Sequence, residues 1–286
     1  MDETRTWRHT RPFQKPFSAD RKGRPVRVSI WYPAAANARA KPMRVVDYLD
    51  RAAPEAFREA NGFLQSRDRR VAAEMAPPQA FESLLKMPMR SHLNGRVARG
   101  RFPLVLYSGG VNSFTLSNVF IAELLASHGF VVATVPSIGP SDQEPEQVFS
   151  RAEVEDTVRD LEVAWSLVRR LPFCDESRLG VFGHSLGGSV ATLFALRNHN
   201  VSAVAGLEST YGFAGSGTGS LTESPAYQPE RMRATLLDLH RGGTQLDLSA
   251  IDGFHFANRY CLTVPRALHG DFTSFVVFAR AFKLPP

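Results

Sequence analysis

Short apolar runs alternate with amphipathic stretches over the C-terminal two thirds of the chain. The run 201–207 has the length and composition of a buried strand, and the stretch 153–171 places Val154, Val158 and Leu161 on one helical face. Further strand-like runs occupy 104–107, 130–135, 179–182, 234–239 and 260–264, and further helical stretches occupy 116–128, 186–197 and 272–282. This alternation is typical of a mostly parallel sheet with crossover helices on both faces, so the pattern predicts an α/β fold.

The stretch 45–95 has a different character. It is rich in charged residues and helix formers, is punctuated by prolines, and contains no convincing strand. We therefore expect a helical insertion at about 45–95 within a single domain that spans residues 1–286. Before it, residues 26–31 alternate apolar and polar side chains, which predicts one more strand.

Composition narrows the classes of protein without naming a function. Hydrophobic residues make up 43% of the 286 residues and charged residues 22%, which is ordinary for a globular protein. The formal net charge is +6, but the basic residues are interspersed with acidic ones, so we expect a solvated surface and no nucleic-acid partner. No apolar run approaches the ~18 residues of a membrane-spanning helix. No secretory signal is visible, which favours a cytoplasmic location and leaves a trimmed export signal open.

The cysteines are too few to organise the fold. Cys174 and Cys261 are the two present, so neither a disulfide framework nor a structural zinc site is expected, and whether the two pair is open.

The segment Gly183-His184-Ser185-Leu186-Gly187 lies between a predicted strand and a predicted helix. It matches the G-x-S-x-G nucleophile elbow in the context that this motif requires. Glycines at the flanking positions allow a sharp turn that lifts the serine hydroxyl above the sheet. Ser185 is therefore the candidate nucleophile.

A serine hydroxyl needs a histidine base and an acid that orients the base, and in this architecture both follow the serine in the chain. His269 lies just after the last predicted strand, in a loop at the carboxyl edge of the sheet, and is the candidate base. The runner-up is His255. Glu208 directly follows the strand 201–207 and is the candidate acid, and the alternatives are Asp238, Asp247 and Asp252.

An acyl-transfer reaction also needs donors for the oxyanion of its tetrahedral intermediate. One candidate is the backbone N–H of Leu186, the residue after the nucleophile. The other is the N–H of Val111, in the glycine-rich loop that follows the strand 104–107. Two backbone donors and a triad suffice for this chemistry, so no metal and no organic cofactor is predicted.

These residues resemble the serine-esterase branch of the α/β-hydrolase superfamily, most closely the platelet-activating-factor acetylhydrolase and dienelactone-hydrolase-like group. The elbow, the ending His269-Gly270-Asp271-Phe272-Thr273 and the strand end Trp31-Tyr32-Pro33 carry the resemblance. It implies an α/β-hydrolase fold and places the acid at the end of the strand after the nucleophile helix, which is Glu208 here. Two positions depart from the group, which usually has Asp at the acid and His-Gly where this chain has Gly109-Gly110.

The predicted function is hydrolysis of small-molecule carboxylic esters through an acyl-enzyme. Two alternatives stay open: a serine peptidase of the same fold, and a non-catalytic binding module on a hydrolase scaffold. The acyl and alcohol groups of the substrate and the oligomeric state cannot be read from local spacing.

Overall fold

A computed structural model describes residues 23–37, 39–74, 76–139, 146–212, 221–243 and 246–282. Within these residues the strands form one seven-stranded sheet in the order β1-β3-β2-β4-β5-β6-β7. The short β1 runs antiparallel to β3, and the other neighbours are parallel. The strands are β1 (Ser29–Trp31), β2 (Phe102–Ser108), β3 (Val131–Val135), β4 (Cys174–His184), β5 (Val201–Leu207), β6 (Thr235–Arg241) and β7 (Arg259–Val264).

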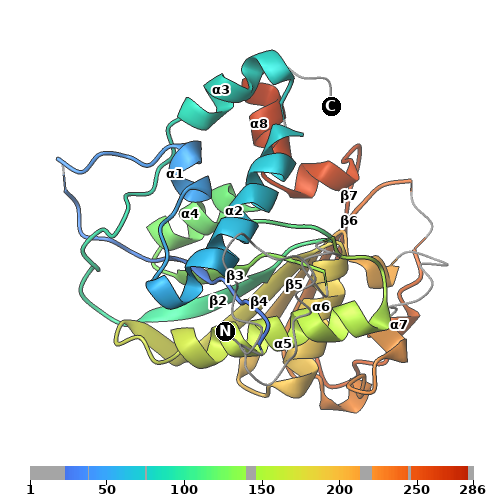
Figure 1. Ribbon diagram of the computed structural model, residues 1–286. Helices are drawn as coiled ribbons and strands as arrows, with labels where there is room; N and C mark the ends of the chain where they lie inside the picture. Colours follow the sequence, from blue (N-terminus) through green and yellow to red (C-terminus); the bar gives the residue numbers. More distant parts are fainter. Residues whose placement is uncertain are drawn as a thin grey trace.

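Side chains alternate between the two faces of this sheet and feed two separate hydrophobic cores. On β2, Leu106 packs into the first core and Tyr107 into the second; on β4, Val181 and Phe182 divide in the same way. This division follows from the two-residue period of a strand. Figure 1 shows helices on both faces of the sheet. The first core contains α5 (Arg151–Val168) and α6 (Leu186–Arg197), and the second contains α4 (Val119–Ser127) and α8 (Phe275–Ala281). A short helix, α7 (Ser249–Asp252), precedes β7.

The stretch 45–95, expected to be a helical insertion, is helical in part, and its described residues after 86 form no helix. It contains α1 (Val45–Leu49), a short 3-10 turn (Glu55–Phe57), α2 (Arg58–Ala73) and α3 (Pro78–Lys86). Helix α2 buries polar and charged side chains, Asn61, Arg67 and Asp68, beside apolar ones. In Figure 1 these helices lie above the sheet, on the same side as α4 and α8.

The parallel register brings the ends of the central strands to one edge. Ser108 pairs with Gly183, and His184 pairs with Leu207, so the loops after β2, β4 and β5 emerge side by side. In open α/β sheets this carboxyl edge is where ligands bind. Each predicted strand and helix has a counterpart in the structure. Strand β4 begins five residues earlier than expected, at Cys174 rather than Leu179.

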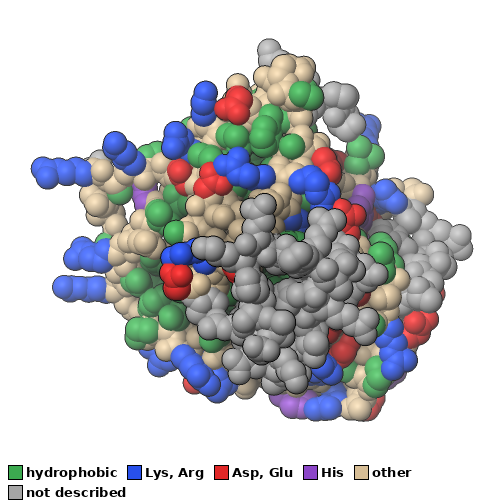
Figure 2. Space-filling model, in the orientation of Figure 1, with side chains coloured by type: hydrophobic (Ala, Val, Ile, Leu, Met, Phe, Trp, Pro, Cys, Tyr) green, Lys and Arg blue, Asp and Glu red, His purple; other side chains and the backbone are tan. Residues whose placement is uncertain are grey.

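The surface and the cysteines add two observations. Acidic and basic side chains are interspersed over much of the face shown in Figure 2. Cys174 is buried and Cys261 is exposed, and both are free thiols. No helix among the described residues combines the length and the apolar character needed to cross a bilayer.

Candidate active site

The turn between β4 and α6 holds Ser185 in a backbone conformation that residues other than glycine rarely adopt. Its φ is 55° and its ψ is −123°. The neighbouring glycines make the turn possible: a Cβ on Gly183 would overlap the backbone of Gly187, and a Cβ on Gly187 would overlap the Ser108 carbonyl. Strained backbone of this kind costs ~1–3 kcal/mol and persists only where the surrounding structure enforces it.

Backbone hydrogen bonds with the end of β5 and with the loop after it hold Ser185 in this conformation. The Ser185 N–H donates to the Leu207 carbonyl at 3.0 Å, and the Thr210 N–H donates to the Ser185 carbonyl at 3.2 Å. Glu208 lies between Leu207 and Thr210 in the chain and also has a positive φ, of 54°. Its own N–H donates to the Leu239 carbonyl at 2.7 Å. The nucleophile turn and the residue predicted to be the acid are thus fixed to each other through the backbone.

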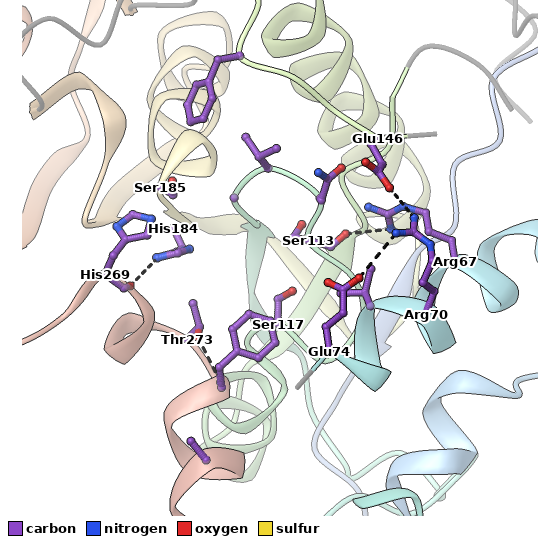
Figure 3. Close-up of a pocket in the computed structure, with 17 residues that line it drawn as sticks. Arg67, Arg70, Glu74, Ser113, Ser117, Glu146, His184, Ser185, His269 and Thr273 are labelled. Carbon is purple, nitrogen blue, oxygen red and sulfur yellow. Dashed lines mark hydrogen bonds and ion pairs between the residues drawn. The ribbon is translucent and has the colours of Figure 1, made fainter. Parts of the chain in front are cut away.

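Ser185 opens into a cavity of about 760 Å³, within the size range of small-molecule sites. Val111 and His269 line the same cavity, as do apolar side chains from the loop before α5 and from α8 (Figure 3). Leu186 and Glu208 are buried and are not among the lining residues. An amide such as that of Leu186, at the first position of α6, has no acceptor within its own helix.

His269 lies at the same end of the cavity as Ser185 in Figure 3, in the 3-10 turn His269–Phe272 that follows β7. The turn is held by Asp271, whose Oδ2 accepts from the Leu268 N–H at 2.8 Å. Burial lowers the pKa of His269, and the positive charge of Arg241 lowers it further. The imidazole is therefore neutral at pH 7, the form that can accept a proton.

His184, the residue before the nucleophile, contacts His269 directly. Its Nε2 lies 3.1 Å from the His269 carbonyl oxygen, and the two rings pack with their centroids 4.6 Å apart. Because a carbonyl can only accept, Nε2 carries the proton. Burial lowers the pKa of His184 to about 4, so this ring is neutral as well. Its position inside the motif was the only sequence signal for this contact.

Glu208 is fully buried, and neither of its carboxyl oxygens has a hydrogen-bond partner among the described residues. The nearest ionic group is Arg241, whose Nε lies 3.6 Å from Oε2. Burial raises the pKa of Glu208, and the charge of Arg241 opposes that rise. A buried carboxyl with unused acceptor capacity is poised to take a further donor.

The alternative acids occupy other environments. Asp238 is buried but already accepts from Tyr211 Oη at 3.1 Å and contacts His240 Nδ1 at 3.2 Å. Asp247 accepts from the Ser249 N–H on the surface, and Asp252 pairs with Arg259. The runner-up base, His255, is exposed and does not line the cavity.

The glycine-rich loop after β2 is anchored on its outer side. Ser113 Oγ and Ser137 Oγ lie 2.9 Å apart, and the Ser137 N–H donates to the Ser113 carbonyl at 3.1 Å. From α2, Arg67 donates to the Ser137 carbonyl at 2.6 Å and to the Ser113 carbonyl at 3.4 Å. The helical insertion therefore contacts the loop that carries Val111, a role that charge patterning along the sequence could not reveal.

Charged side chains form the rim of the cavity opposite Ser185. Arg70 lies 2.8 Å from Glu146 and 3.8 Å from Glu74, and all three line the cavity (Figure 3). Within the described residues, no cluster of three His, Cys, Asp or Glu side chains could hold a metal ion.

Comparison with known proteins gives a partial family match and a clear fold match. The profile of the prolyl oligopeptidase family, Peptidase_S9, matches residues 115–209, which include the elbow. A ferulic acid esterase from Streptomyces cinnamoneus superposes with a TM-score of 0.64 at 18% identity, over 90% of this chain and 71% of that chain. The fold is that of the α/β-hydrolases.

Two other structures show weaker likeness to this chain. DcsB in complex with its substrate analogue has a TM-score of 0.46 at 16% identity, over 65% of this chain and 90% of that one. A putative dipeptidyl aminopeptidase IV from Bacteroides ovatus has a TM-score of 0.47 at 15% identity, over 64% and 31%. No curated protein sequence matches the chain. The predicted fold is confirmed, and the narrower likeness to the acetylhydrolase and dienelactone-hydrolase group stays a prediction.

Proposed function

We propose that this α/β-hydrolase is a serine hydrolase that cleaves carboxylic esters of small molecules through an acyl-enzyme. Ser185 is the nucleophile, His269 the general base and Glu208 the acid that holds the imidazole. The N–H groups of Leu186 and Val111 form the oxyanion hole. The observation that carries the proposal is the strained Ser185 turn opening, together with His269, into one cavity of about 760 Å³.

In the proposed reaction, Ser185 Oγ attacks the ester carbonyl carbon while its proton passes to the neutral His269 imidazole. The carbonyl oxygen takes the negative charge and accepts from the two backbone donors. The intermediate collapses, the C–O bond to the alcohol breaks, and His269 returns the proton to the leaving alkoxide. Water then attacks the acyl-enzyme by the same steps, which releases the acid and restores Ser185.

Glu208 is favoured as the acid by its position and by its chemistry. It follows the strand whose end is hydrogen-bonded to Ser185, and its buried oxygens have acceptor capacity left. When His269 is protonated during the reaction, an ionised Glu208 would stabilise the imidazolium. Arg241 supports this role, since its charge opposes the effect of burial on the Glu208 carboxyl.

A serine peptidase of the same fold is the second candidate. The match of residues 115–209 to the prolyl oligopeptidase family favours it, whereas the ferulic acid esterase in the fold comparison has an ester-cleaving name. Both activities would use the same nucleophile. The substrate decides between them.

The first experiment tests for a reactive serine. A fluorophosphonate probe should label the wild-type chain, and the Ser185→Ala variant should show no labelling. Absence of labelling in the folded wild type would support a non-catalytic binding module and overturn the proposal.

The second experiment tests substrate class and the acid together. Turnover of p-nitrophenyl esters of graded acyl length should exceed turnover of the matching peptidyl p-nitroanilides; the reverse order would identify a peptidase. Glu208→Ala should lower kcat/KM by about a thousandfold or more, as loss of a triad acid does. The matched variant Asp247→Ala should leave it near the wild-type value. If Asp247→Ala is the damaging change, Glu208 is not the acid.

A further inference from the structure

A second cavity of about 470 Å³ lies apart from the catalytic one. It is enclosed by β1, α1, the loop before β2 and the C-terminal half of α4, and it shares no lining residue with the first cavity. Its apolar wall includes Trp31, Tyr32, Met43 and Tyr48. Trp31 and Tyr48 stack with centroids 6.1 Å apart, and their polar atoms lie 3.4 Å from each other, so this wall is fixed.

The partly buried cation that lines this cavity is Arg51, which follows α1 in the chain. Its side chain is half-buried, and among the described residues it has neither a hydrogen-bond acceptor nor an ion-pair partner. The buried carboxylate of α2, Asp68, pairs with Arg27 and Arg67. Burial lowers the pKa of Arg51, and the charge of Arg27 lowers it further. A half-buried guanidinium with no counter-ion is costly, and an anion entering the cavity would remove that cost.

The other charges around the cavity select the kind of anion. Glu123 is buried in the wall and is fully engaged, since its carboxylate accepts from Tyr48 Oη at 2.8 Å and from the Ser91 N–H at 2.9 Å. It therefore does not pair with Arg51, but its charge disfavours a dianion such as a phosphate monoester. Arg90 also lines the cavity, with an exposed side chain.

The surface around the entrance is basic. Figure 2 shows Lys and Arg side chains along the left edge of the molecule, where the loops next to α1 and before β2 lie. Exposed basic residues of these two loops include Arg39, Lys41, Arg90, Arg96 and Arg99. Such a surface attracts small anions toward the cavity.

We propose that this cavity is an accessory binding site for a small aromatic carboxylate. The carboxylate pairs with the fork of the Arg51 guanidinium, whose planar geometry matches a carboxylate. The flat apolar body of the ligand packs against Trp31 and Tyr48. The site is separate from Ser185, so it does not depend on the proposed ester hydrolysis.

The test uses isothermal titration calorimetry with the full chain carrying Ser185→Ala, so that catalysis plays no part. Benzoate should bind with a stoichiometry of one at this site. Arg51→Met should weaken that binding about tenfold or more, because a charge-assisted pair is lost. Benzamide, the neutral isostere, should bind correspondingly more weakly, and phenyl phosphate should bind more weakly than benzoate.

Two further variants keep the test decisive. Arg44→Met removes an exposed arginine outside the cavity and should leave benzoate affinity within about twofold. Arg51→Gln replaces Arg51→Met if the latter fails to fold, as judged by circular dichroism. The proposal is overturned if benzoate does not bind at millimolar concentration, or if the folded Arg51 variants bind it as well as the parent. Equal loss in Arg44→Met would also overturn it, because it would show only general attraction to a basic surface.

Discussion

At the scale of single residues, the proposed site brings together two histidines that differ in burial and in hydrogen bonding. His269 is neutral because it is buried beside Arg241, and His184 is neutral because it is buried more deeply. The first has the chemistry of a base, while the second donates its Nε2 proton to the backbone of the first.

The lowered pKa of His269 predicts the acid limb of the pH profile. A general base works in its neutral form, so activity is lost as the pH falls through its pKa. Since that pKa is below the ordinary histidine value of about 6.5, kcat/KM should hold its plateau below that pH before it declines. Ester hydrolysis measured from pH 4 to pH 9 checks this. A midpoint above 7 would contradict the neutral, buried environment of His269.

If His269 is the base, its contact with His184 predicts that His184 positions it. His184→Phe keeps a ring against the imidazole but removes the hydrogen bond at 3.1 Å, whose net worth is ~1 kcal/mol. We expect kcat to fall about fivefold with little change in KM. His184→Gln retains an N–H donor and should recover part of the loss in steady-state assays. A wild-type kcat in the folded Phe variant would refute the role.

At the scale of elements, the nucleophile turn is a junction of three loops packed backbone to backbone. Gly183→Ala places a Cβ against the backbone of Gly187, where no flexible side chain can move away. The turn should unfold or open, with a loss of several kcal/mol of stability or no soluble protein. On the same strand, Gly180→Ala meets its nearest atom at 3.7 Å and is the control. Thermal unfolding of both variants makes the comparison, and equal melting temperatures would argue against a crowded turn.

Helix α2 supports the glycine-rich loop through Arg67. Arg67→Met leaves the Ser137 carbonyl without this donor and removes a charge from the Asp68 cluster, so unfolding should become easier by about 3 kcal/mol. Because the loop carries Val111, kcat should fall more than KM rises. Arg70→Met, whose ion pairs are half-exposed, should cost less than about 1 kcal/mol in denaturant titrations. If Arg67→Met lowered stability but left kcat unchanged, α2 would have no role in positioning the glycine-rich loop for catalysis.

At the scale of the whole molecule, the sheet separates two cores, and the cavity at Ser185 shares no lining residue with the cavity at Arg51, so the two proposed functions predict independent effects of mutation. The cysteines report on the integrity of this packing. Burial raises the pKa of Cys174 to about 11, and Cys261 is exposed on β7. A thiol reagent such as Ellman's should therefore titrate one thiol in the native chain and two in denaturant, and reductant should leave Tm unchanged. Two reactive thiols under native conditions would indicate an open first core.

The local sequence was informative wherever one element decides the outcome. The period-two alternation and the apolar runs predict the strands, because successive side chains of a strand point to opposite faces of the sheet. The elbow could be recognised because it needs glycine for a local reason: a Cβ on Gly183 would clash with the backbone of Gly187, only four residues along the chain. Ser185, and the loop that carries His269, follow from the order of elements along the chain.

What the sequence alone could not supply is contact between residues far apart in the chain. The Arg67 link to Ser137 and the packing of His184 on His269 join separate elements, and so does the cavity that Arg51 lines together with Trp31 and Tyr48. Such contacts depend on how the sheet twists and how the insertion lies over it, and no local spacing encodes either. The sequence by itself determined an α/β architecture with a serine on a strained turn. The tertiary structure decided which side chains surround that serine, because burial and charge depend on neighbours that only folding brings together.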